Sequence, residues 1–280
     1  MPTTYSHYRF GKECIGVMPE DLQKIVNEHR ALFDIGVHGP DIFFYDLKHD
    51  DVAAYGGDMH FKPARDFFEN SIKVYHEHEE KDEMMAYLLG FLSHFTLDSQ
   101  THGYVDRKME ESGITHNKVE SQYDGYLMRK EGRKVNLVDR SESLKPSKEA
   151  AHIIALFFPF DEKVMYRVCR CHKRVINSLN CISNLKYKLL TFGLSLTKDD
   201  GKKDLPVNPE EEDICKDSNL RMEKLQKKAL RLYPKLLNDY LKALNGEKKL
   251  MRYFNHDFGP WADYKEIPVL SYEEELSYKI

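Results

Sequence analysis

AYLLGFLSHFTLDSQTHGYV, residues 86–105, lies within a segment from about Asp82 to Glu111 that contains no proline and only two glycines. The apolar residues of this segment recur at the spacing of an α-helix, at Met85, Leu88, Leu89, Leu92 and Phe95. We therefore expect one long helix that is buried on most sides. A helix of this kind favours a helical fold built around it.

The same helix carries three side chains that can bind a metal, His94, Asp98 and His102. At about 100° per residue, groups four residues apart are each offset by roughly 40°, so the three share one face. The predicted next helix, capped by Thr115, begins with His116 and reaches Glu120 one turn later. Facing ligand pairs on two helices are typical of dinuclear metal sites in helical bundles.

Two interpretations of these residues remain open at this point. The histidines and Asp98 can be a solvated helix face or a buried hydrogen-bonded cluster, as lone histidines often are. However, the surrounding sequence is strongly apolar, and buried polar groups need partners. A metal site is therefore favoured. Imidazole and carboxylate ligands suit zinc, although iron and manganese accept them too.

Helical signals also dominate the segments on either side. A helix is expected from Pro19 to Gly36, and the segment GVHGPDIFFYDL, residues 36–47, is expected to be a loop that holds Asp41. A second loop, DDVAAYGGDMHF, residues 50–61, should place His60 just before a helix that begins near Pro63.

The C-terminal half continues this pattern. Helix starts are expected at Ser147 and Asp161, with a long helix ending near Leu196. The polar run TKDDGKKDLPVNPEEED, residues 197–213, is predicted to be a flexible connection before a final helix from about Asp217 to Asn245. Period-two alternation never persists long enough to build a sheet, so the fold class is all-α, a helical bundle that would enclose the candidate metal site.

Composition narrows the class of protein. The chain has 280 residues, of which 41% are hydrophobic and 31% charged, which is typical of a globular protein. We expect one domain over residues 1–280, with a metal-binding part at about 1–135 and a helical part at about 145–280. A net charge of −4 gives no general attraction to nucleic acid. Five cysteines without a C-x-x-C pair argue against a disulfide framework and a thiolate zinc site.

The first 16 residues contain no apolar run behind a basic start, and no stretch reaches the length of a membrane span. A cytoplasmic location is therefore expected, with a secreted form that has lost its leader as the alternative. The segment from Arg221 to Leu250 carries nine Lys/Arg against three Asp/Glu. It suggests a peripheral membrane contact, although an ordinary solvated helix face is the commoner explanation for such a segment.

Five motifs together resemble the zinc-dependent phospholipase C family, which is related to the single-strand-specific zinc nucleases. They are YSHYRFG at 5–11, GPDIFF at 39–44, GGDMHF at 56–61, LLGFLSHFTLDSQTH at 88–102 and HNKVE at 116–120. Their order and approximate spacing match over roughly the first 125 residues, and the combination is far more specific than any single motif.

The resemblance implies a fold and a set of ligands. The family has an all-α bundle that encloses three zinc ions, so two Zn²⁺ are expected here and a third is implied. By resemblance the ligands of the first zinc are Asp41, His60, His94 and Asp98. Those of the second are His102, His116 and Glu120. The third would be held by His7 with Asp98 shared between sites.

The sequence departs from the family pattern in two places. The family's third zinc also takes an N-terminal tryptophan, whereas this sequence begins Met-Pro-Thr and its only tryptophan is Trp261. Three residues separate Asp98 from His102, where we expect five in the bacterial phospholipases. The first departure places the third site in question.

The resemblance implies a phosphodiester hydrolase of the phospholipase C type, acting on a phospholipid or another phosphodiester. A hydroxide bridging the two zinc ions would attack phosphorus, and Asp41 would orient or deprotonate the attacking water. Two alternatives stay open. One is a nuclease or phosphomonoesterase on the same zinc cluster, with nucleic acid as a partner only in that case. The other is a helical protein that binds zinc without catalysis.

Overall fold

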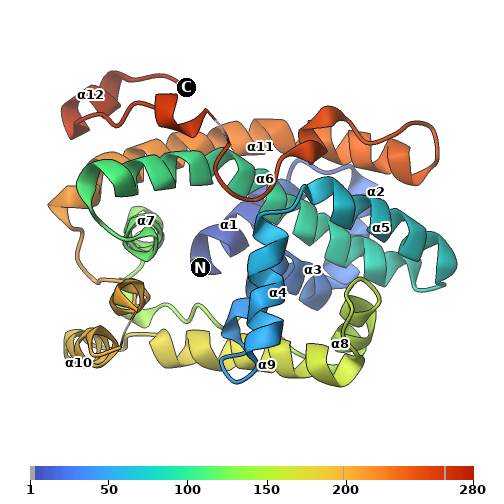
Figure 1. The fold of residues 1–280 in the computed structure, drawn as a ribbon, viewed down its shortest axis with the longest axis horizontal. Coiled ribbons are helices and arrows are strands. Elements are labelled where there is room, and N and C mark those ends of the chain that lie inside the picture. The colour runs from blue at the N-terminus through green and yellow to red at the C-terminus, as the bar shows by residue number, and fades with distance from the viewer. Residues whose placement is uncertain (1–3, 198, 262) are drawn as a thin grey trace.

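The computed structural model describes residues 4–197, 199–261 and 263–280, and these residues form helices and no strand. The all-α prediction is therefore confirmed (Figure 1). The α-helices are α1 Thr4–Ile15, α2 Glu20–Glu28, α3 Arg30–Gly36, α4 Asp50–His60, α5 Ala64–Glu77, α6 Lys81–Ser112, α7 His116–Lys130, α8 Lys148–Ala155, α9 Glu162–Leu179, α10 Asn184–Ser195, α11 Lys216–Leu244 and α12 Tyr272–Ser277. The 3₁₀ helices are η1 Gly39–Tyr45, η2 Val135–Leu137, η3 Asp200–Asp204, η4 Asp213–Cys215, η5 Arg252–Asn255 and η6 Tyr264–Glu266.

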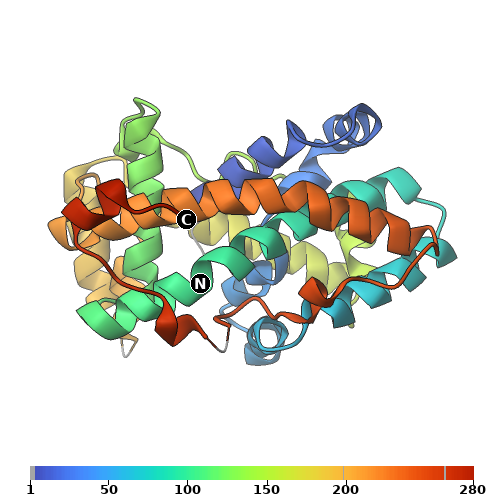
Figure 2. The same cartoon turned by 90° about the horizontal axis from the view of Figure 1, so that it is seen from above.

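Helix α6 is the centre of the molecule, and its prediction as one long buried helix is confirmed. It ends where Gly113 adopts a left-handed conformation with φ 67°. It packs against α3 on one side and against α11 on another, and Figure 2 shows α6 and α11 running side by side across the molecule. The packing of α3 is close because a Cβ atom on Gly90 would lie 2.4 Å from the carbonyl oxygen of Phe33.

Three helix starts predicted from capping residues are confirmed. The side chains of Thr115, Ser147 and Asp161 each accept a hydrogen bond from a backbone N–H three residues later. These caps satisfy amides that the helix itself leaves unpaired, which is why such residues mark the starts of helices in sequence. The helix predicted from about Asp217 to Asn245 is present as α11 and continues through Pro234, but it is not the last one, because α12 follows it.

Two predicted helices are in fact pairs of shorter ones. The helix expected over residues 19–36 breaks at His29, whose φ of −110° and ψ of 38° lie outside the helical region, and forms α2 and α3. The long helix expected to end near Leu196 breaks between α9 and α10, where Ser183 caps the second helix. Apolar spacing continues across both breaks, so periodicity alone does not reveal them.

Two segments predicted to be loops are helical. Residues 36–47 contain the 3₁₀ helix η1, and residues 50–61 contain the α-helix α4. The glycines that suggested a loop allow close packing instead, since a Cβ on Gly56 would lie 2.8 Å from the Cβ of Phe43 in η1. The predicted helix after Pro63 is present as α5.

The connection predicted to be flexible, residues 197–213, is held against α7 in its described part. Asn117 donates a hydrogen bond to the carbonyl of Gly201, and Lys118 pairs with both Asp204 and Glu212. The polar side chains that suggested a loose linker are the ones that bind it to α7.

The main apolar core draws on both halves of the chain. It runs from Phe10 through Phe91 to Phe258 and includes Val168 of α9 and Tyr233 of α11. The division into a metal-binding part and a helical C-terminal part stays a prediction, but the two share this core. Within the described residues, no helix has the combination of length and hydropathy that crossing a membrane requires.

Candidate metal centre

Helix α6 provides three of the predicted ligands on successive turns. His94 and Asp98 are fully buried, whereas His102 is partly exposed toward the surface. His94 Nε2 lies 3.0 Å from Asp98 Oδ2, and His102 Nε2 lies 3.7 Å from Asp98 Oδ1. The i, i+4 spacing therefore places all three functional groups together, as the sequence predicted.

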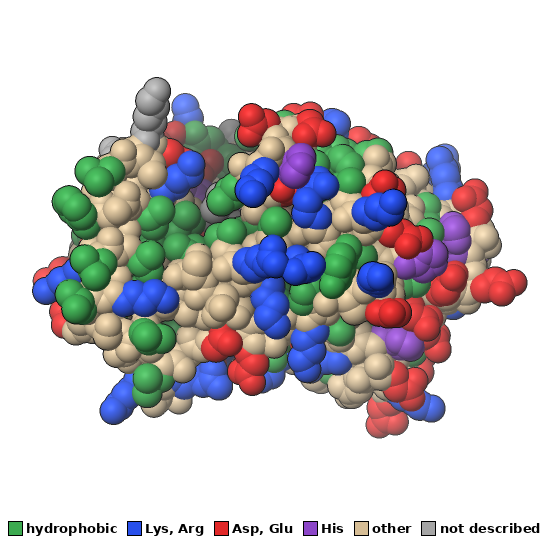
Figure 3. Space-filling model, turned by 90° about the horizontal axis from the view of Figure 1, so that it is seen from below, with side chains coloured by type: hydrophobic (Ala, Val, Ile, Leu, Met, Phe, Trp, Pro, Cys, Tyr) green, Lys and Arg blue, Asp and Glu red, His purple; other side chains and the backbone are tan. Residues whose placement is uncertain are grey.

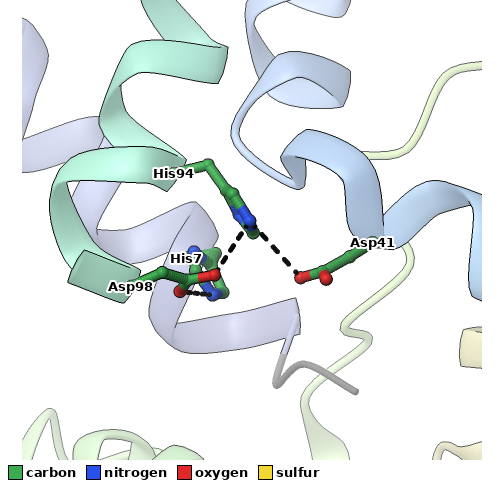
Figure 4. Close-up of side chains that lie close together, drawn as sticks. All are labelled: His7, Asp41, His94 and Asp98. Atoms are coloured by element: carbon green, nitrogen blue, oxygen red, sulfur yellow. Dashed lines mark ion pairs between the residues drawn. The ribbon is translucent and has the colours of Figure 1, made fainter. Parts of the chain in front are cut away.

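Helix α1 brings His7 to the same place. The amides of Tyr5 and Ser6 donate to the two carboxylate oxygens of Asp124 at 3.1 and 2.8 Å, which fixes the first turn of α1. The His7 ring then stacks on the ring of His94 with centroids 4.5 Å apart. Its Nε2 lies 3.2 Å from Asp98 Oδ1, as Figure 4 shows.

The 3₁₀ helix η1 positions Asp41 opposite His94. Gly39 has φ +48°, and a Cβ atom there would lie 2.2 Å from the ring of His94, so this approach requires glycine. Asp41 Oδ2 lies 3.8 Å from His94 Nε2 (Figure 4), and Asp41 Oδ1 lies 2.9 Å from Nε2 of His60. His60 comes from the last residue of α4, where its Nδ1 contacts the carbonyl of Gly56 at 2.7 Å.

A second group lies beside the first, at the start of α7. His116 Nε2 is 2.9 Å from Glu120 Oε1, and His102 Nε2 is 3.5 Å from the same oxygen. Because His102 also faces Asp98, the second group adjoins the first. The centre is therefore one continuous cluster of imidazoles and carboxylates.

The ligand atoms of the cluster are arranged as they would be around a metal ion, and not as they would be in a network of hydrogen bonds. His94 Nε2 and Asp98 Oδ2 are close, yet among the described residues neither atom has a hydrogen-bond partner. When His60 Nδ1 donates to the carbonyl of Gly56, the neutral ring directs a lone pair from Nε2 at the Asp41 oxygen 2.9 Å away. Such lone pairs repel each other unless a cation lies between them. Histidine and carboxylate together are a donor set that zinc accepts.

The charges of the cluster are strongly coupled. Burial opposes ionisation of Asp98, but the facing histidines outweigh it and hold the pKa of that carboxyl well below its usual range. In the same way burial acts to lower the pKa of His102, while Asp98 and Glu120 raise it to about 10. The pKa of Glu120 is lowered by His116 and His102 despite burial. Carboxylates held ionised in a buried site are prepared to bind a cation.

The orientation of the predicted ligand His102 depends on a residue near the C-terminus. The Nδ1 of His102 donates to the backbone carbonyl of Phe258, which leaves Nε2 as the nitrogen available to a metal. Phe258 therefore contributes to the centre although it lies 156 positions after His102 in the sequence. Sequence reasoning missed this contact because a backbone carbonyl leaves no side-chain signal.

An open cavity of about 300 Å³ leads to the cluster. It is lined by Asp41, His60 and the second group, and also by the apolar residues Phe44, Phe61 and Pro260.

The structure brings all eight predicted ligands together, although the grouping differs from the expected one. Two groups have mutually close ligand atoms: His7, Asp41, His94 and Asp98, and His102, His116 and Glu120. His7, expected at a separate third zinc, lies within the first group, and His60 joins it through Asp41. The assignment of each residue to a particular metal stays a prediction.

Sequence reasoning also missed a buried histidine pair next to the centre. His38 and His172 lie edge to face with ring centroids 4.8 Å apart, and Tyr45 stacks on His172. Burial lowers the pKa of His38 well below its usual value and that of His172 to about 3, so both rings are neutral. His38 directly precedes Gly39-Pro40-Asp41 in the sequence, but His172 carries no motif that would have indicated it.

A family model described as zinc-dependent phospholipase C matches residues 6–164, more than half of the chain. The chain belongs to the zinc-dependent phospholipase C family. The matched region contains all eight predicted ligands, and it extends beyond the 125 residues in which the motifs were recognised. No match was found among curated proteins or among solved structures.

Family membership confirms two predictions, a zinc-dependent phosphoric ester hydrolase and zinc as its metal. The two groups of close ligand atoms agree with at least two metal positions. The substrate class is correspondingly a phospholipid or another phosphodiester.

Proposed function

We propose that this protein hydrolyses the head-group phosphodiester of a phospholipid, on the glycerol side, in the manner of a phospholipase C. The observation that carries the proposal is the cavity at the ligand cluster, whose lining combines predicted ligands with apolar side chains. Phe61 in this lining is 79% exposed, which is unusual for a large aromatic side chain and suits contact with an acyl chain.

The ligand sets follow the resemblance, adjusted to the geometry. Asp41, His60, His94 and Asp98 would hold one zinc, and His102, His116 and Glu120 the other. His7 shares Asp98 with the first group at 3.2 Å, so a third zinc there would use His7 and Asp98. Bound zinc would supply an activated water at neutral pH and positive charge for the phosphate oxygens.

The chain's own residues would then direct the reaction. Asp41 lines the cavity, and its pKa is lowered, against the effect of burial, by His94 and His60, so it is a carboxylate at neutral pH. It would orient the attacking water and accept its proton as the new oxygen–phosphorus bond forms. The bond from phosphorus to the glycerol oxygen breaks, and that oxygen takes up a proton to give diacylglycerol and a phosphorylated head group.

A substrate panel tests this proposal. We expect the zinc-loaded protein to release the phosphorylated head group from a short-chain phosphatidylcholine below its micellar concentration, and Glu120→Gln to lose this activity. Single-stranded DNA and a simple aryl phosphomonoester serve as competing substrates. Faster cleavage of either would support the nuclease or phosphomonoesterase alternative. Absence of hydrolysis of every phosphoester by a protein that retains its zinc would support a non-catalytic role.

A further inference from the structure

Helix α10 exposes an apolar stripe that nothing in the described chain covers. Leu185, Leu189, Phe192 and Leu196 follow one another at spacings of four, three and four residues, which places them on one side of the helix. Each of these side chains is more than 60% exposed, and no residue of α10 is buried. Figure 3 shows apolar side chains gathered at this end of the molecule. Contiguous exposed apolar surface of this kind marks an interaction site.

The opposite side of α10 packs against the rest of the protein only over a small area. The helix packs against η3, and Tyr187 and Leu190 on that side are half-buried. A stripe that served only to hold α10 in place would face η3 rather than solvent. The exposed stripe therefore has no structural use within the described residues.

Basic residues lie beside the stripe. Residues 162–196, which cover α9 and α10, contain seven Lys/Arg and one acidic residue, although the whole chain has a net charge of −4. Figure 3 shows Lys and Arg side chains across the middle of this face, over α9. Basic residues next to an apolar helix face are the composition of helices that lie in the surface of an anionic membrane.

The stripe is also close to the mouth of the metal centre. α10 packs on η3, and Gly201 of η3 accepts a hydrogen bond from Asn117 at 2.9 Å. Thr115 donates to Asp204 of the same 3₁₀ helix at 2.7 Å, and the predicted ligand His116 lies between Thr115 and Asn117. A surface that binds α10 would therefore lie near the rim of the cavity.

We propose that the exposed face of α10 inserts into the surface of a bilayer that contains anionic lipid, with the basic side chains of α9 and α10 against the head groups. This inference rests on the proposed function, because it explains how a phospholipid reaches the cavity. A second copy of the chain is a poorer occupant, since the same basic residues would face one another across the interface. The basic segment from Arg221 to Leu250 is also a poorer candidate because Leu236 and Tyr240 on its apolar stripe are buried.

The test compares the zinc-loaded wild type with Leu189→Ser/Phe192→Ser in cosedimentation with vesicles. The control is Leu276→Ser in α12, since Leu276 is 63% exposed and Leu189 62%. We expect binding to phosphatidylcholine vesicles that contain phosphatidylglycerol, and at least about tenfold weaker binding by the double variant, because two large apolar side chains leave the bilayer. The control should bind like wild type. Added salt should weaken the binding of the wild type.

Equal sedimentation of wild type and double variant would overturn the proposal. It would also be overturned if the wild type were a dimer that the double variant converts to monomer, with neither binding vesicles, since the occupant would then be a second copy. Hydrolysis of a soluble short-chain phospholipid separates this proposal from the proposed function. The double variant should retain that activity and lose only hydrolysis of vesicles. Wild type that binds vesicles through α10 but cleaves no phosphodiester would contradict the proposed function alone.

Discussion

Asp98 is the residue on which the centre depends most, because its two oxygens face His7, His94 and His102. Asp98→Asn keeps the shape of the side chain but removes the negative charge that offsets bound cations. We expect lower zinc content and hydrolysis reduced by at least about a hundredfold, with circular dichroism unchanged. Asp46→Asn is the control, since Asp46 is equally buried but pairs with Arg167 outside the centre. Equal zinc content in both variants would contradict the assignment of Asp98.

A substitution at Gly39 tests whether the backbone of η1, which carries Asp41, packs closely on His94. An alanine there would place its Cβ 2.2 Å from the His94 ring, at a φ of +48° that side chains rarely adopt. We expect Gly39→Ala to lose zinc and to lower the free energy of unfolding by at least about 1–3 kcal/mol. Gly193→Ala in α10 is the matched control, because a Cβ there meets nothing within 4 Å. Both are measured by metal analysis and urea unfolding. Full zinc content in Gly39→Ala would refute the close packing of η1 on His94.

His172 gives a pH-dependent contribution to stability. Burial lowers its pKa to about 3 from 6.5, so between these values the unfolded chain binds a proton that the folded chain does not. Stability from this residue is therefore present above pH 6.5 and is lost as pH falls. From pH 7.5 to 5 we expect the wild type to lose about 2 kcal/mol more stability than His172→Phe at the same zinc concentration. Parallel pH profiles for the two proteins would show that His172 is not held neutral.

The helices that were predicted correctly are those that short stretches of sequence specify by themselves. The long helix α6 and the capped starts of α7, α8 and α9 follow from apolar periodicity and from single side chains that satisfy helix amides. The ligands on α6 and α7 were predictable for the same reason, because their spacing along one helix sets their geometry.

The two segments that were wrongly predicted to be loops contain glycines used for packing. Gly56 and Gly57 suggested a loop, but α4 continues through them because Gly56 packs against Phe43. Sequence alone does not distinguish a glycine that bends the backbone from one that admits a neighbouring helix, since that neighbour is distant in sequence. Recognition of Asp41 and His60 therefore came from family resemblance rather than from predicted elements.

Gly90 tests this explanation at the level of helix packing. A Cβ on Gly90 would lie 2.4 Å from the Phe33 carbonyl oxygen, so Gly90→Ala must separate α3 from α6. Intrinsic helix propensity alone would favour alanine by roughly 1 kcal/mol. We expect the opposite sign, a loss of about 1–3 kcal/mol measured by urea unfolding, because packed backbones resist overpacking. A Gly90→Ala protein more stable than wild type would contradict the close packing of the two helices.

The whole molecule encloses the centre with parts that are far apart in the chain. Helix α11 covers α6 along its length, and the segment after it supplies the carbonyl of Phe258 to His102. Residue 258 lies outside the region that the family model matches, residues 6–164. The C-terminal half is therefore more than an appendage, because it completes the core and orients a predicted ligand.

We expect the eight predicted ligands to hold zinc, and metal analysis of the protein, purified without a histidine tag or added metal, measures this. With His94→Ala as the comparison, we predict about two to three zinc per wild-type chain and clearly less in the variant, because His94 is fully buried among the ligands. Less than about half a zinc per wild-type chain, unchanged in the variant and not restored by dialysis against zinc, would show that these residues do not form a zinc site.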